Sequence, residues 1–216
     1  MIITISRQFG AGGSEVARRV AEALDWRLVD NDLVDRVAER AGLPPEEVAQ
    51  RDERAPGFVE RLVRALTRVP ELFPKPAEKV PEPEEASLVR LTESVVAELA
   101  AEGRVVLVGR AGPAVLRGKY DALHIKIVAP LADRLRTASE RLGLAPKEAE
   151  KALQETDANR ARYLKQHYGR DWNDSTNYDM VLNTGTLGLQ GASEVIVAET
   201  KRRWLESRKV GMSEDR

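Results

Sequence analysis

The beginning of the chain places a glycine-rich loop directly between a strand-like and a helix-like segment. Residues 2–5 form a β-rich run, residues 7–14 read Arg-Gln-Phe-Gly-Ala-Gly-Gly-Ser, and apolar residues recur at helical spacing from Val16 onward. A glycine loop at a helix N-terminus offers unpaired amide hydrogens and the positive end of the helix dipole to an anion. This position therefore predicts a polyphosphate site, although the glycines would also permit close packing of strand against helix.

Strand-like and helix-like segments continue to alternate along the chain. After the first helix, strands are expected over residues 26–30, 105–108, 123–128 and 178–182, and helices over residues 88–101, 130–143, 146–166 and 192–204. This order favours an α/β fold, in which a parallel sheet carries helices on its faces.

Composition describes an ordinary globular chain and excludes several classes of function. The 216 residues are 42% hydrophobic and 32% charged, which suits one compact, soluble domain. The absence of cysteine excludes disulfides and a cysteine nucleophile and fits a cytoplasmic location, as does a start without signal-peptide features. The formal net charge of -1 gives no general attraction for nucleic acid, and no apolar run is long enough for a membrane span.

The loop matches the Walker A pattern, G-x-x-x-x-G-K-[ST], only in part. Gly12 and Ser14 match, whereas Arg7 replaces the first glycine and Gly13 replaces the lysine. That lysine normally neutralises the transferred phosphate, so another cation must act here, and Arg7 is the nearest candidate in the sequence. Ser14 keeps the hydroxyl expected to contact Mg²⁺.

Five ordered segments resemble the cytidylate kinase-like family, which carries a lysine-free glycine loop. They are residues 3–13, 108–112, 127–134, 168–172 and 178–184. The resemblance implies a P-loop NTPase-type three-layer sandwich with a central parallel sheet and a helical lid. It also implies that ATP and Mg²⁺ are used to phosphorylate a nucleoside monophosphate, with CMP or dCMP as the first acceptors to consider.

The family pattern assigns roles to individual residues of this chain. The ATP phosphates would be held by Gly10, Ala11, Gly12, Gly13 and Ser14, with Ser14 also at the metal. The acceptor would be bound by Asp30, Asp32 and Arg110. Charge on the migrating phosphoryl group would be stabilised by Arg7, Arg160 and Arg162, with Arg160 the first choice on the lid. Asp157 is a further catalytic candidate, three residues before Arg160 on the same helical face. The adenine site would be lined by Arg134 and Thr184.

The same resemblance divides the single domain, residues 1–216, into regions. Residues 31–102 would form a helical acceptor-binding region with a Pro-rich insert at 70–86, and residues 145–177 would form the lid. Two alternatives stay open: a kinase for another small metabolite, and a non-catalytic nucleotide-binding protein. The base and sugar of the acceptor, the activity of a lysine-free loop, the second metal ligand, the role of the insert and a homo-oligomeric state are left open as well.

Overall fold

The computed structural model describes residues 1–30, 84–109 and 112–211 and contains one five-stranded, all-parallel sheet. Its strands are β1 (Ile2–Arg7), β2 (Arg27–Val29), β3 (Val105–Val108), β4 (Ala122–Val128) and β5 (Met180–Asn183), in the spatial order β2-β3-β1-β4-β5. The described helices are α1 (Gly13–Leu24), α5 (Glu84–Glu102), α6 (Gly112–Leu116), α7 (Leu131–Leu142), α8 (Pro146–Tyr168), the 3₁₀ turn η2 (Ser175–Asn177) and α9 (Thr184–Gly211).

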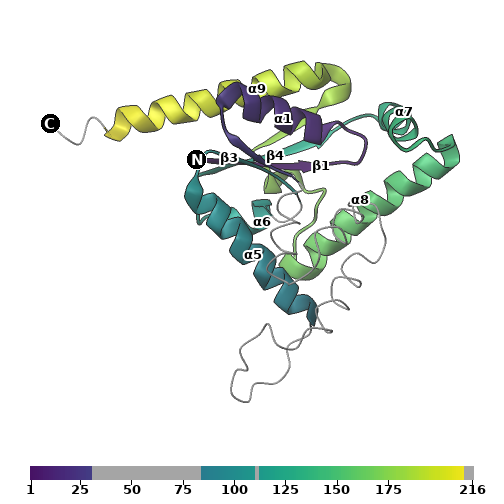
Figure 1. The fold of residues 1–216 in the computed structure, drawn as a ribbon, viewed down its shortest axis with the longest axis horizontal. Coiled ribbons are helices and arrows are strands. Elements are labelled where there is room, and N and C mark those ends of the chain that lie inside the picture. Colours follow the sequence, from purple (N-terminus) through teal and green to yellow (C-terminus); the bar gives the residue numbers. More distant parts are fainter. Residues whose placement is uncertain (31–83, 110–111, 212–216) are drawn as a thin grey trace, which may run out of the picture.

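Helices cover both faces of the sheet, so the predicted three-layer α/β fold is confirmed (Figure 1). Helices α1 and α9 pack together on one face, and α5 and α6 lie on the other. Helices α7 and α8 pack against each other beyond the carboxyl ends of the strands. Ligands of open parallel sheets bind at this edge, which makes it the place to look for a site.

The two faces of the sheet differ in chemistry because side chains alternate along each strand. On the face toward α1 and α9, Ile3 and Ile5 of β1 join a buried apolar cluster that includes Val16 and Val20 of α1. On the face toward α6, β1 carries the buried polar residue Thr4. The apolar face gives β1 and α1 a fixed relation, and this fixes the loop that joins them.

Several element boundaries differ from the sequence-based prediction, among them the starts of β5, α5 and α9. Strand β5 begins at Met180, two residues later than expected, and α5 begins at Glu84, inside the predicted Pro-rich insert. Helix α9 begins at Thr184 rather than near residue 192 and contains a break at Gly188, where φ is 67°. The periodicity expected for the last helix was recognised only beyond this break.

Part of the prediction lies outside the described residues. This holds for residues 31–83, which contain most of the proposed acceptor-binding region and the Pro-rich segment through residue 83, and for Asp32 and Arg110. In the part of the chain that is described, none of the helices combines the length and apolar character needed to cross a membrane.

Candidate active site

The glycine loop follows β1 and adopts backbone conformations that glycine favours. Gly10 and Gly12 have φ values of 78° and 74°, in the left-handed region. A Cβ atom at Gly10 would lie 2.6 Å from the backbone oxygen of Arg134, and one at Gly12 would clash with the Leu189 side chain. The loop is thus shaped by α7 on one side and by α9 on the other.

Helix α1 begins at the loop without a side-chain cap. Its N-cap residue is Gly12, and no side chain accepts a hydrogen bond from the first turn. The first amide groups of any α-helix have no partner within the helix, and together with the dipole they attract an anion. The start of α1 can therefore bind a phosphate group.

The two departures from the Walker A pattern have one steric cause. A Cβ atom at Gly13 would lie 2.5 Å from Cβ and 2.9 Å from Cδ of Arg7. Contacts this short do not occur between real side chains, so this backbone has room for a side chain at position 7 or at position 13 but not at both. Arg7 therefore occupies the space that a lysine at position 13 would need.

Three buried or half-buried polar side chains fasten the loop to helices α7 and α8. Asp157 of α8 accepts a hydrogen bond from the backbone N of Phe9 at 2.9 Å, and Arg134 of α7 donates Nε to the backbone O of Phe9 at 2.8 Å. Arg134 and Asp157 also form an ion pair with each other. Arg160, which is only 4% exposed, donates Nη1 to the backbone O of Arg7 at 2.8 Å.

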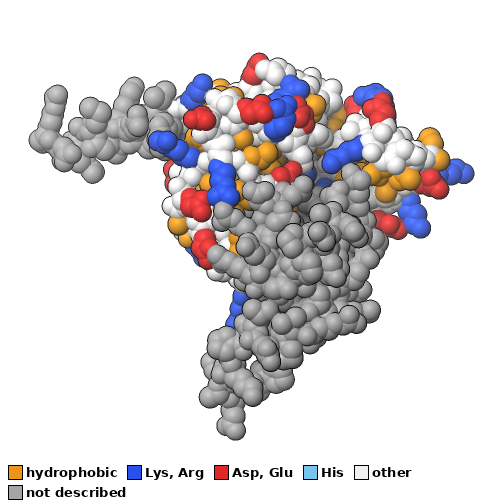
Figure 2. Space-filling view, in the orientation of Figure 1, with side chains coloured by type: hydrophobic (Ala, Val, Ile, Leu, Met, Phe, Trp, Pro, Cys, Tyr) orange, Lys and Arg blue, Asp and Glu red, His pale blue; other side chains and the backbone are white. Residues whose placement is uncertain are grey.

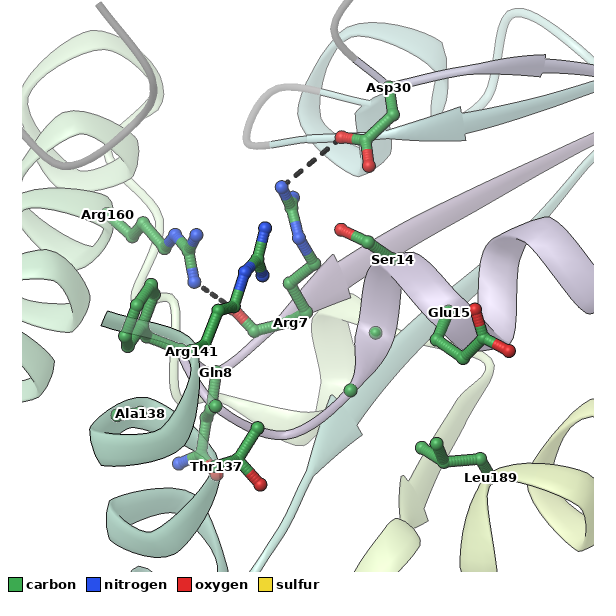
Figure 3. A pocket seen from close by; sticks show the side chains of 14 residues that line it. Arg7, Gln8, Ser14, Glu15, Asp30, Thr137, Ala138, Arg141, Arg160 and Leu189 are labelled. Carbon is green, nitrogen blue, oxygen red and sulfur yellow. Dashed lines mark hydrogen bonds and ion pairs between the residues drawn. The ribbon is translucent and has the colours of Figure 1, made fainter. Parts of the chain in front are cut away.

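Beside the loop lies a cavity of about 300 Å³ (Figure 3). It is lined by Arg7, Gln8, Phe9, Gly10, Gly12, Gly13, Ser14, Glu15, Asp30, Thr137, Ala138, Arg141, Arg160 and Leu189. Three arginines and two carboxylates thus line the described part of this cavity. The wall combines the loop, the start of α1, the end of β2, one face of α7, and one residue each of α8 and α9.

Both carboxylates of the cavity are already engaged. Asp30 accepts a hydrogen bond from Nη2 of Arg7 at 3.3 Å, which links the end of β2 to the start of the loop. Glu15 accepts hydrogen bonds from Arg18 and Arg19, and these guanidinium groups lower its pKa to about 2. A negatively charged ligand would therefore meet little unpaired negative charge among the described lining residues.

The structure brings together many of the residues that the sequence suggested for one site. Arg7, Gly10, Gly12, Gly13, Ser14, Asp30 and Arg160 line the cavity, and Ala11 lies in the same loop. Arg160 had been expected to reach the site from a closing lid, but it is already buried and bound to the end of β1.

Other predicted site residues lie behind the loop or away from it. The Arg134 guanidinium is bound to Phe9 and Asp157, and the Thr184 hydroxyl donates to the backbone O of Ala11 at 2.8 Å, so both hold the loop from outside the cavity. Arg162 is exposed and donates to Asn159 of its own helix at 3.1 Å.

Sequence reasoning missed Arg141, in the last turn of α7. Arg134, Ala138 and Arg141 follow one another at i, i+4 and i+7, which places them on one face of the helix. Ala138 on that face belongs to the same buried apolar cluster as Phe9 of the glycine loop. The spacing from Arg134 would have identified Arg141 if the burial of Arg134 against the loop had been known.

Strand β4 carries two buried polar side chains, Lys126 and His124, that have structural partners. Lys126 is 4% exposed, donates Nζ to the backbone O of Trp172 at 2.6 Å and lies 4.1 Å from the centre of the Trp172 ring. Burial lowers the pKa of Lys126 to about 8. His124 shares a hydrogen bond of 2.8 Å with Thr4, and burial lowers its pKa. Neither side chain lines the cavity.

The surface over α1 and α9 carries mixed charge. Figure 2 shows acidic and basic side chains interspersed among the described residues of this face. On α1, Arg18 lies between Glu15 and Glu22 and pairs with both, at 2.7 Å and 2.5 Å. The described part of this face thus presents no patch of a single sign for a polyanion such as nucleic acid.

Comparisons with known proteins match the chain to one sequence family and to relatives that cover most of its length. The sequence profile of the cytidylate kinase-like family matches residues 2–186. The cytidylate kinase of Pyrococcus horikoshii is 28% identical over 200 residues, covering 92% of this chain and 87% of that protein. The cytidylate kinase of Pyrobaculum aerophilum is 29% identical over 197 residues, covering 90% of each.

Solved structures show the same fold at lower identity. An uncharacterised protein from Eubacterium ventriosum superimposes with a TM-score of 0.66 at 20% identity, covering 92% of this chain and 97% of that one. Shikimate kinase from Bacteroides thetaiotaomicron gives a TM-score of 0.53 at 14% identity, with coverage of 93% and 98%. With a profile match over nearly its whole length, the chain belongs to the cytidylate kinase-like family.

Proposed function

We propose that the protein transfers the γ-phosphoryl group of ATP to the phosphate of a nucleoside monophosphate, with CMP or dCMP as the preferred acceptors. The observation that carries the proposal is the uncapped start of α1, which opens on a cavity lined by three arginines. Its amide groups and the arginines suit a polyphosphate. Membership of the cytidylate kinase-like family supports the kinase reaction, and the archaeal cytidylate kinases support the choice of acceptor.

In this proposal the glycine loop holds the ATP phosphates through its backbone. The backbone N of Phe9 donates a hydrogen bond to Asp157, and the backbone N of Ala11 donates one to the backbone O of Gln8. These two bonds fix the shape of the loop. The amides of Gly12, Gly13 and Ser14 at the start of α1 are then the groups that face the phosphates. Arg7 supplies the charge that the Walker lysine supplies elsewhere.

The residues around Ser14 fit a magnesium ion that is held mainly by substrate. Ser14 is half-buried and lines the cavity together with Asp30. Among the described residues, no group of three or more acidic, histidine or cysteine side chains forms a metal site. Kinase magnesium is usually bound by one or two protein oxygens, phosphate oxygens and water, so Ser14 with Asp30 nearby is sufficient. When bound, the ion neutralises charge on the phosphates.

The acceptor would enter beyond the end of β2. Asp30 stands there and is oriented by Arg7, and Asp32 and Arg110, proposed for the same task, belong to the segments outside the described residues. An acceptor phosphate oxygen would form a bond to the γ-phosphorus while the bond from that phosphorus to the β,γ-bridging oxygen breaks, and ADP leaves. Arg160 would act by holding the backbone of Arg7 in place, which preorganises the loop.

One panel assay tests the proposal. ADP release from Mg·ATP is measured with CMP, dCMP, UMP, AMP and GMP and with small phosphorylated metabolites that contain no base. The expected result is that CMP or dCMP gives the highest kcat/KM, and that Ser14→Ala lowers kcat for the same acceptor. Turnover of a metabolite without a base would favour the alternative that the protein is a kinase for another small metabolite. ATP binding without turnover of any acceptor would favour the alternative of a non-catalytic nucleotide-binding protein.

A further inference from the structure

We propose that Arg141 contacts the terminal phosphate of ATP and supplies the mobile cation of the reaction. This inference rests on the proposed function and adds a residue to the same site. Arg141 is exposed at the carboxyl end of α7, yet its side chain lines the cavity beside the glycine loop. In Figure 3 its guanidinium lies, in projection, between those of Arg7 and Arg160.

Arg141 differs from the other two cavity arginines in its freedom to move. Arg7 is 9% exposed and paired with Asp30, and Arg160 is 4% exposed and bound to the backbone O of Arg7. Neither can change position without breaking these bonds. Among the described residues, none forms a hydrogen bond or an ion pair with Arg141. Arg141 can therefore turn toward an incoming phosphate without breaking a hydrogen bond or an ion pair to the described residues.

Three carboxylates in or near this part of the site are each paired with another arginine. Asp157 is paired with Arg134, and Asp133 accepts a hydrogen bond from Arg136 at 2.9 Å. Glu15 is held by Arg18 and Arg19 on α1. A phosphate in the cavity could thus pair with Arg141 without displacing any of these ion pairs, and guanidinium groups bind phosphate through paired hydrogen bonds.

The arrangement assigns separate tasks to the three arginines. Arg7 and Arg160 form a fixed part of the wall, which suits phosphates that are bound throughout the reaction. Arg141 is placed at the rim of the cavity on a flexible side chain, which suits a group that changes its charge and position during transfer. The lysine-free loop would then depend on two cations, one fixed at Arg7 and one recruited at Arg141.

The test compares Arg141→Ala and Arg141→Lys with Arg136→Ala, a matched control. Arg136 lies on the same helix but is 66% exposed and pairs only within α7 among the described residues. Arg141→Ala should lower kcat about 10- to 100-fold, the effect of losing one charged hydrogen bond in the transition state. Arg141→Lys should keep more activity than Arg141→Ala, and Arg136→Ala should keep the wild-type rate.

Binding of Mg·ATP and Mg·ADP, measured without acceptor, gives a readout that does not need turnover. Arg141→Ala should weaken ATP binding several-fold more than ADP binding, because only ATP carries the terminal phosphate. Equal loss for both nucleotides, or no loss of either ATP affinity or kcat, would overturn the proposal. A wild-type protein that phosphorylates no acceptor would refute the proposed function alone, since the ATP to ADP comparison still decides the role of Arg141. The melting temperature should stay at the wild-type value, whereas a purely structural role at the end of α7 would lower it.

Discussion

Removing the Arg160 guanidinium should loosen the glycine loop before it affects the chemistry. Arg160→Ala deletes a charged hydrogen bond to the backbone O of Arg7 and leaves that buried acceptor without its 2.8 Å partner. It also removes a positive charge 3.6 Å from Asp157. Breaking a buried charged contact of this kind costs about 3 kcal/mol. For a chain of 216 residues, that loss corresponds to a fall of about 6 to 12 °C in melting temperature.

The assay is thermal unfolding followed by ATP binding at a temperature where the variant is folded. Arg160→Ala should lower both the melting temperature and the ATP affinity, and Arg160→Lys should fall between it and the wild type. Arg162→Ala, on the same helix but exposed and bonded only to Asn159 among the described residues, is the stability control and should shift the melting temperature by less than about 2 °C. An Arg160→Ala variant with wild-type stability but a much reduced kcat would refute the reasoning and return Arg160 to a role confined to the transition state.

Three further perturbations follow from the structure. Gly10→Ala should destabilise the fold by about 2 kcal/mol or more and weaken ATP binding, because φ is 78° and an added Cβ would meet the backbone of α7. The control Gly143→Ala, at φ 63° in open space, should cost about 1 kcal/mol, with both free energies measured by denaturant unfolding. Gly13→Lys should lower activity, and adding Arg7→Gly should restore part of it; additive effects in this double-mutant cycle would contradict the steric argument. Burial lowers the pKa of Lys126 to about 8, so between about pH 8 and 10.5 this side chain is protonated in the unfolded state but not in the folded state. The free energy of unfolding should therefore rise with pH over this range in the wild type but not in Lys126→Met, and parallel pH profiles of the two proteins would disprove this.

Local patterns were enough to predict the elements that carry the site. The β-rich run 2–5 and the helical spacing after Ser14 predicted β1, the loop and α1, which the structure confirms. Pro130 and Gly143 marked both ends of α7 correctly, because proline suits a helix start and glycine the left-handed residue after its end. Such signals reside in neighbouring residues and need no knowledge of the fold.

The partners of the site residues could not be predicted in the same way. Arg134 binds the backbone of Phe9, and Arg160 binds that of Arg7, across more than a hundred residues of chain. A backbone oxygen carries no sequence signature, so an arginine that holds a loop looks the same in the sequence as one that faces a ligand. The free position of Arg141 became visible only when these two arginines were seen to be occupied.

The exclusion between side chains at positions 7 and 13 constrains how such a loop can change over evolutionary time. Starting from this chain, a lysine at position 13 is tolerated only after Arg7 has become glycine, because even the Cβ of residue 7 would be 2.5 Å from that of residue 13. The intermediate with glycine at both positions lacks the cation that each loop type carries at one of them. Selection for activity therefore opposes either possible first step, and a lineage that carries Arg7 tends to keep it. The two loop types would be expected to persist as separate lineages, with positions 7 and 13 changing together.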